Sequence, residues 1–267
     1  MVVDDVELVP LVDALGVLGP LAELYPDVPP AEWRRYREQY PQLFAAESWR
    51  LSCTCYLLRA GGRTVIVDTG VGPPGLWDWE PEWEGGLPRE LQRHGISPAD
   101  VDAVLLTHVH VDHVGWNTDA TGEPVFPRAW YLLHADALAA AGERADRPHI
   151  PRCVLGIADR LETLAGDAEI APSVTVVELP GHDAGHLGVR IGTGAPLIAD
   201  AAGHPALLDR PDAAFFSDLD HERAVATRRR LLDDLVDRPV LAVCGHYPDG
   251  GVGYVVSRGG HVVWQAA

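Results

Sequence analysis

Residues Thr107-His108-Val109-His110-Val111-Asp112-His113 hold three imidazoles and a carboxylate within six positions. They follow directly after an apolar run at 101–106, which predicts a buried strand. In an extended segment, His108, His110 and Asp112 would share one face. Polar groups gathered in this way have no packing rationale unless a cation compensates them. The stretch therefore predicts a metal site on a loop that is anchored by a strand.

The residue types of this cluster indicate which metals suit it. Imidazole and carboxylate ligands together suit zinc, manganese, iron or cobalt. The cluster contains no thiolate, which argues against a closed structural zinc site. We therefore expect an open site that performs hydrolysis.

Three further apolar segments end on His or Asp. The run at 174–179 leads into the turn Pro180-Gly181-His182-Asp183-Ala184-Gly185-His186, the run at 196–199 ends at Asp200, and the run at 240–243 leads to His246. Four strand ends thus deliver potential ligands, and we expect them to meet at one site.

These motifs together resemble the metallo-β-lactamase superfamily, whose signatures are HxHxDH, PGHxxGH, an Asp at a strand end and a final GH. The segment VIVDTG at 65–70 is similar to the first motif of that family, so the resemblance extends over nearly the whole chain. HVGWNT at 113–118, FPRAWY at 126–131, His204-Pro205 and the closing GHYP resemble the group around the acyl-homoserine lactonases and methyl parathion hydrolases.

The resemblance implies a centre of two divalent metal ions, with zinc expected and manganese or iron as alternatives. The implied ligands are His108, His110 and His182 for one ion, Asp112, His113 and His246 for the other, and Asp200 as the bridge. It further implies that a metal-bridging hydroxide cleaves an ester, lactone or thioester bond of a small organic substrate. Asp112 is our candidate for orienting the nucleophile and for passing a proton to the leaving group.

Two other activities share much of this pattern. A phosphotriesterase-like hydrolase would use the same metals with a different pocket. A mononuclear iron persulfide dioxygenase would use fewer ligands, although His110, where flavodiiron proteins typically have Glu, favours hydrolysis. A metal-binding protein without activity is a third possibility.

Other residues are candidates for supporting roles. Ligand histidines normally donate their second N–H to an outer acceptor, for which we name Asp68 and Thr107, with His186 as a further support or an ordinary loop residue. His204 is a candidate catalytic residue beside Asp200, or else a surface histidine. The lactonases usually have Tyr where this chain has Gly203, so the hydrogen bond to the substrate carbonyl would have to come from His204 or Tyr247.

Aromatic residues near the motifs are candidates for the substrate pocket. The loop at 75–84 contains several Trp residues, and aromatic walls would suit a bulky organic substrate. The candidates are Trp77, Trp79, Trp116 and Tyr247. The loop residues could equally staple the loop or form a subunit contact, and a helix at 31–40 could cap the site or support a homodimer.

The hydrophobic pattern predicts an α/β fold, a four-layered αββα sandwich that forms one domain over 1–267. Strands are expected at 51–58, 64–67, 101–106, 129–133, 174–179, 187–191, 196–199, 240–243, 254–256 and 261–264. Helices are expected at 31–40, 87–94, 134–141, 152–164 and 222–236.

Composition and charge limit the kinds of partner that this protein can bind. The formal net charge of -18 opposes a nucleic-acid substrate, which needs a basic surface. No apolar run approaches the ~18 residues of a membrane span, and no signal peptide is evident, so we expect a cytoplasmic enzyme. The four cysteines are too few for a disulfide scaffold, and Cys53 and Cys55 are interpreted as buried packing residues on one face of a strand.

Overall fold

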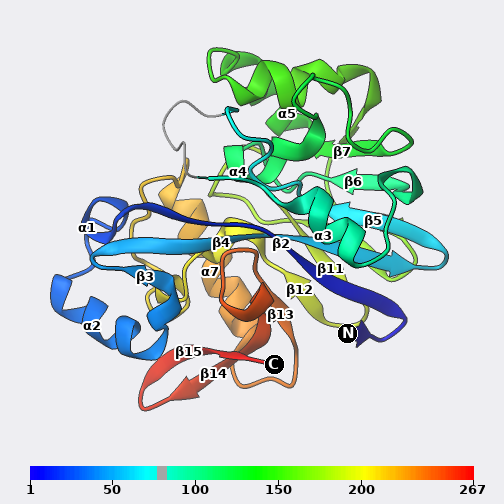
Figure 1. Cartoon of the computed structure of the whole chain (residues 1–267). Coiled ribbons are helices and arrows are strands. Elements are labelled where there is room, and N and C mark those ends of the chain that lie inside the picture. Colours follow the sequence, from blue (N-terminus) through cyan, green and yellow to red (C-terminus); the bar gives the residue numbers. More distant parts are fainter. Residues whose placement is uncertain (77–82) are drawn as a thin grey trace.

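A computed structural model describes residues 1–76 and 83–267 of the chain. Its strands form two sheets that pack face to face, with helices on the outer faces (Figure 1). The predicted four-layered sandwich is confirmed. Among the described residues, no helix has the length and the apolar character needed to cross a membrane.

The first sheet is 8-stranded and comes from the first 164 residues. Its strands follow the order β1-β2-β4-β5-β6-β7-β8, and β3 pairs with β4. They are β1 (Val2–Val3), β2 (Val6–Pro20), β3 (Phe44–Ala45), β4 (Ser48–Ala60), β5 (Arg63–Val67), β6 (Ala103–Leu105), β7 (Trp130–His134) and β8 (Leu161–Leu164). The strands β5 to β8 run parallel to one another, so their carboxyl ends share one edge.

The second sheet is 7-stranded and follows the chain order in reverse, from β15 to β9. Its strands are β9 (Ala168–Ala171), β10 (Val174–Glu178), β11 (Leu187–Ile191), β12 (Ala195–Leu197), β13 (Ala242–Val243), β14 (Val252–Arg258) and β15 (His261–Ala266). Within it, β12 and β13 are parallel neighbours.

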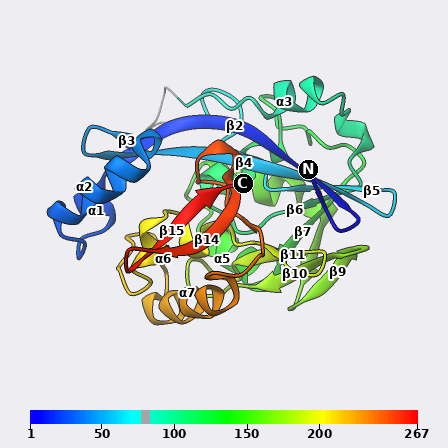
Figure 2. The same ribbon diagram turned by 90° about the horizontal axis from the view of Figure 1, so that it is seen from below.

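The helices lie outside the two sheets, with α3 and α7 on opposite sides of the molecule (Figure 2). The α-helices are α1 (Leu21–Leu24), α2 (Pro30–Gln39), α3 (Leu87–Arg93), α4 (Val111–Val114), α5 (Ala135–Glu143), α6 (Ala206–Asp209) and α7 (His221–Leu235). Short 3-10 or π turns are η1 (Pro41–Leu43), η2 (Pro98–Asp100), η3 (Gly115–Asn117), η4 (Ile150–Val154), η5 (Leu155–Arg160), η6 (Ala199–Ala202) and η7 (Asp249–Gly251).

The core between the sheets is built from β-branched and other apolar side chains. Val65 and Leu105 of the first sheet and Val176 and Val189 of the second belong to one buried cluster, and none is more than 1% exposed. Burying each such side chain stabilises the fold by roughly 1.5–3 kcal/mol. This rigid double sheet supports the loops at its edge.

The long strand β2 (Val6–Pro20) was not predicted from the sequence. Its pairing with β4 shifts register between Val12 and Ala14 and again between Val17 and Gly19. Bulges of this kind break the alternation of apolar and polar residues on which strand prediction depends. The first bulge has a function in the fold, because Asp13 accepts hydrogen bonds there from Val71 N, Leu87 N and Trp116 Nε1.

The helix predicted over 152–164 is wrong. This segment forms the short turns η4 and η5 and then the strand β8, which pairs with β7. Gly156 is a weak helix former, and the parallel pairing with β7 provides hydrogen-bond partners for the backbone of 161–164.

Candidate metal centre

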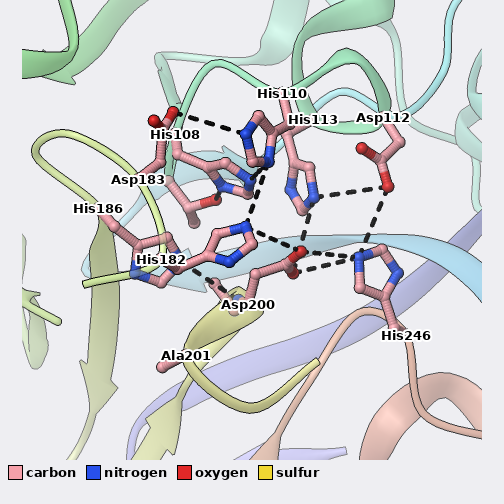
Figure 3. A network of polar contacts seen from close by, with 12 residues as sticks. His108, His110, Asp112, His113, His182, Asp183, His186, Asp200, Ala201 and His246 are labelled. Atoms are coloured by element: carbon pink, nitrogen blue, oxygen red, sulfur yellow. Dashed lines mark hydrogen bonds and ion pairs between the residues drawn. The ribbon is translucent and has the colours of Figure 1, made fainter. Parts of the chain in front are cut away.

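The predicted ligands come from four strand ends that meet at one edge of the two sheets (Figure 3). His108 and His110 follow β6, and His182 follows β10. Asp200 lies in η6 after β12, and His246 follows β13. Because β12 and β13 are parallel neighbours, Asp200 and His246 emerge side by side.

The alternation in HxHxDH suggests an extended segment. The structure differs, because the second half of the segment forms a helical turn. His110 is the N-cap residue of α4, so Asp112 and His113 project from a helical turn. This turn brings both side chains to the same centre as His108 and His110 (Figure 3).

Three imidazoles form the first group of the centre. His110 Nδ1 lies 3.0 Å from His108 Nε2 and 3.2 Å from His182 Nε2. These nitrogens are among the atoms that could hold one metal ion together.

Asp112, His113 and His246 form the second group, and Asp200 lies between the two groups. Asp112 Oδ2 lies 3.5 Å from His246 Nε2 and 3.7 Å from His113 Nε2. Asp200 Oδ1 is 3.1 Å from His246 Nε2, while Asp200 Oδ2 is 3.6 Å from His182 Nε2 on the other side. The structure thus brings all seven predicted ligands together.

Outer partners assign the tautomers of the ligand histidines. His113 Nδ1 lies 2.8 Å from Asp68 Oδ2, and His246 Nδ1 lies 2.7 Å from the Ser52 carbonyl oxygen. A carbonyl or carboxylate oxygen only accepts, so Nδ1 carries a proton, and in the neutral ring that binds metal the lone pair is on Nε2, which faces the centre. Asp68 also accepts from Thr107 N and Thr107 Oγ1, which fixes its position.

A buried ion pair supports His182. Asp218 Oδ1 lies 3.3 Å from His182 Nδ1, and Asp218 Oδ2 accepts from Arg228 of α7. Arg228 also donates to the carbonyl oxygens of Ala201 and Ala213. Neither Asp218 nor Arg228 was named from the sequence, because no motif marks a partner that is distant along the chain.

Two residues of the PGHxxGH turn have distinct roles. Asp183 Oδ1 pairs with Arg144 Nη1 at 2.8 Å, and Asp183 Oδ2 faces His110 Nε2 at 3.9 Å. His186 is fully buried, with Nδ1 2.9 Å from the Leu179 carbonyl oxygen, and its Nε2 accepts from Asp200 N. His186 therefore supports the backbone of Asp200 and does not reach the centre itself.

The donor set fits divalent metal ions. His113 Nε2 and Asp200 Oδ1 are buried without a hydrogen-bond partner among the described residues, which is costly unless a cation satisfies them. Burial and the neighbouring imidazole of His182 lower the pKa of His110 to about 3, and burial with His113 and His110 holds the pKa of His108 well below its usual range. Both are therefore neutral imidazoles, the form that binds metal.

A cavity of about 380 Å³ opens onto the centre. Its walls include His110, Asp112, His182, Asp200 and His246. Its apolar side is formed by Leu18, Leu24, Trp49, Trp83, Phe215 and Phe216. Of these, only Trp83 belongs to the Trp-containing loop singled out in the sequence.

Three predicted pocket or catalytic residues are not among the described residues that line this cavity. His204 is fully buried among aromatic rings, with Trp33 and Trp49 within 5.5 Å of its ring centroid. Tyr247 is fully buried and donates to the Ala202 carbonyl oxygen, while Trp116 Nε1 donates to Asp13. These side chains pack and anchor loops. The catalytic role predicted for His204 and the pocket lining predicted for Tyr247 and Trp116 are therefore wrong. Trp77 and Trp79 lie outside the described residues.

Comparison with known proteins decides the family. Residues 48–246 match the family model described as the metallo-beta-lactamase superfamily. The chain belongs to this superfamily. The metallo-β-lactamase fold expected from the motifs is confirmed, and so is the coarse prediction of a metal-binding hydrolase.

Several members of the superfamily are similar to this chain, although their sequence identity to it is modest. An N-acyl homoserine lactonase of Bacillus cereus is 28% identical over 210 residues, which cover 72% of this chain and 80% of that protein. The solved structure of AidC, a dizinc quorum-quenching lactonase in complex with a product, has a TM-score of 0.86 at 22% identity and covers 100% of this chain and 96% of that one. The hydrolase AbOPH has a TM-score of 0.83 at 22% identity, with the same coverage.

Proposed function

We propose that this metallo-β-lactamase superfamily member is a dinuclear, zinc-dependent hydrolase that opens lactones and cleaves related ester or thioester bonds of small organic substrates. One observation carries the proposal: residues of both groups of candidate ligands line the same cavity, whose other walls are mostly apolar. The lactonase relatives support the lactone as the first substrate class to test.

Two divalent ions bound here would supply Lewis acidity and a water whose pKa is lowered towards neutrality. The chain's own residues then orient this water and transfer its proton. The Asp112 side chain is 15% exposed and lines the cavity, so its carboxylate can hold a water by a hydrogen bond and pass a proton to the leaving group. Asp200 is more deeply buried and is fixed through its backbone by His186, which suits a role in holding the metals.

The cavity supports a substrate that combines a reactive carbonyl with an apolar group. Trp83, Phe215 and Phe216 would contact the apolar part, which is desolvated at the wall. Arg147 and Glu23 also line the cavity and are exposed, so polar parts of a substrate can interact near solvent.

Gly203 leaves this chain without the phenol that the lactonases usually have at this position. A Cβ at this position would lie 3.5 Å from His246 Cδ2 and 3.9 Å from Asp200 Cγ, in ordinary contact with the ligands. A Cβ there would also lie 3.7 Å from Trp49 Cη2, so this buried position is close-packed and adds no room to the cavity. We infer that the substrate carbonyl is polarised here without a phenol at this position.

The alternatives differ in metal content and in the bond cleaved. A phosphotriesterase-like activity would use the same groups. The mononuclear iron dioxygenase is less well supported, because the carboxylate of Asp200 lies between His182 of the first group and His246 of the second. The homodimer, the cytoplasmic location and the lack of a nucleic-acid partner stay predictions.

The test is a panel of lactones, aryl esters, thioesters and phosphotriesters offered to the zinc-loaded protein and to its Asp112→Asn and Asp233→Asn variants. Asp233 is exposed on α7 and serves as the matched control. We expect the wild type and Asp233→Asn to hydrolyse lactones or esters, and Asp112→Asn to lose about 100-fold or more in kcat. A fully loaded protein that cleaves only phosphotriesters, or none of the panel, would overturn the proposal.

A further inference from the structure

A sulfur atom lies beside the second group of ligands. Cys53 of β4 is 2% exposed, and its Sγ lies 3.9 Å from Asp112 Oδ2. Cys53 Sγ, a carboxylate oxygen of Asp112 and a ring nitrogen of His246 all lie within 4.8 Å of one another. None of the histidine and aspartate motifs includes this cysteine, and its interpretation from the sequence was core packing.

The backbone of β4 holds Cys53 against the centre. The Ser52 carbonyl oxygen is the outer partner of His246 Nδ1, and Thr54 N donates to the Gly245 carbonyl oxygen at 3.1 Å. Both neighbours of Cys53 are thus bonded to the loop that carries His246. The hydroxyls of Ser52 and Thr54 lie 2.8 Å apart on one face of the strand, so the side chain of Cys53 projects from the other face.

We propose that Cys53 is a sulfur ligand of the ion held by Asp112, His113 and His246. The proposal rests on the dinuclear centre proposed above. With Asp200 the ion would have five protein donors, at angles of about 90–120°. Zinc binds sulfur at about 2.3 Å and oxygen at about 2.0–2.2 Å, so two such ligands lie about 3.0–3.9 Å apart. The 3.9 Å between Cys53 Sγ and Asp112 Oδ2 lies at the upper end of this range.

The binding step needs no oxidant or reductant. The S–H bond of Cys53 breaks, its electron pair forms the bond to the metal, and the proton passes to solvent. One thiolate among imidazole and carboxylate ligands favours thiophilic ions, so this group selects zinc, cobalt or cadmium over manganese.

Cobalt is the probe for this ligand, because a thiolate bound to Co²⁺ produces an intense charge-transfer absorption in the near ultraviolet. The full-length protein is loaded with Co²⁺ and compared with Cys53→Ser, Cys53→Ala and Cys55→Ser. Cys55 is the matched control, since it is equally buried two residues further along the same strand. Folding of each variant is checked by circular dichroism.

We expect the absorption in the wild type and in Cys55→Ser, and its loss in both Cys53 variants. We also expect the Cys53 variants to hold cadmium at least tenfold more weakly at one of the two sites, with manganese binding unchanged. Two bound cobalt ions without the absorption, or an absorption that persists in both Cys53 variants, would overturn only the proposal for Cys53. A wild type that binds no cobalt at the second group would overturn the dinuclear centre as well.

Discussion

Asp218 Oδ1 lies 3.3 Å from His182 Nδ1, and the other oxygen of the same carboxylate is paired with Arg228. Both side chains of the ion pair are 1% exposed. Arg228 also donates to the carbonyl oxygen of Ala201, the residue after Asp200. The middle of α7 thereby fixes two candidate ligands that are far apart in the sequence.

Asp218→Asn should weaken metal binding. The amide retains the shape of the carboxylate but accepts more weakly from His182 Nδ1–H, and outer partners of this kind typically contribute about 10–100-fold to metal affinity. Competition with a coloured chelator measures the effect, with Asp233→Asn on the same helix as the control. Equal affinities in both variants would show that the ion pair has a structural role only.

Phe216→Ala should change substrate selection more than folding. Phe216 is 58% exposed and lines the cavity, so truncation removes contact area for an apolar substrate group. We expect KM for a substrate with a long apolar chain to rise about tenfold, with kcat within about twofold, and a smaller change for a short-chain substrate. Trp130→Ala removes an exposed aromatic from β7 and should leave both values unchanged. An equal rise in KM for short and long chains would contradict this role.

Asp13 should make stability depend on pH. Burial raises its pKa to about 6, above the 3.8 of an ordinary Asp. The folded state therefore holds this proton more tightly than the unfolded state, and stability is lost as pH rises from about 4 to about 6, by up to about 3 kcal/mol. The measurement is urea unfolding of wild type and Asp13→Asn across this range, with metal removed from both.

The Asn variant lacks the titrating group, so the stability of the wild type relative to Asp13→Asn should fall as pH rises. A relative stability that stays constant, or that increases with pH, would show that the donors around Asp13 outweigh its burial.

The sequence was sufficient to predict which candidate ligands meet, because HxHxDH, PGHxxGH and the strand-end Asp200 and His246 are local patterns. Asp68 was predictable for the same reason, since β5 and β6 are parallel neighbours that end together. The supporting residues Asp218, Arg228 and Arg144 were not, because each reaches the centre through a tertiary contact that leaves no spacing in the sequence.

The pocket walls were predicted poorly for a related reason. Sequence proximity to a motif made His204, Tyr247 and Trp116 candidates, yet His204 and Tyr247 are fully buried and the half-buried Trp116 is bonded to Asp13 away from the cavity. The actual walls come from Leu18 in β2, Trp49 in β4 and the segment at 215–217. The bulges that hid β2 from pattern analysis also hid its contribution to the site.

The most direct test of the account is the metal content of the purified protein by plasma mass spectrometry, with His182→Ala and Asp200→Ala variants beside the wild type. We predict about two zinc ions per wild-type chain and a lower content in both variants, because each removes a donor from the centre. About one iron per wild-type chain, or a zinc content unchanged by both substitutions, would contradict the dinuclear centre.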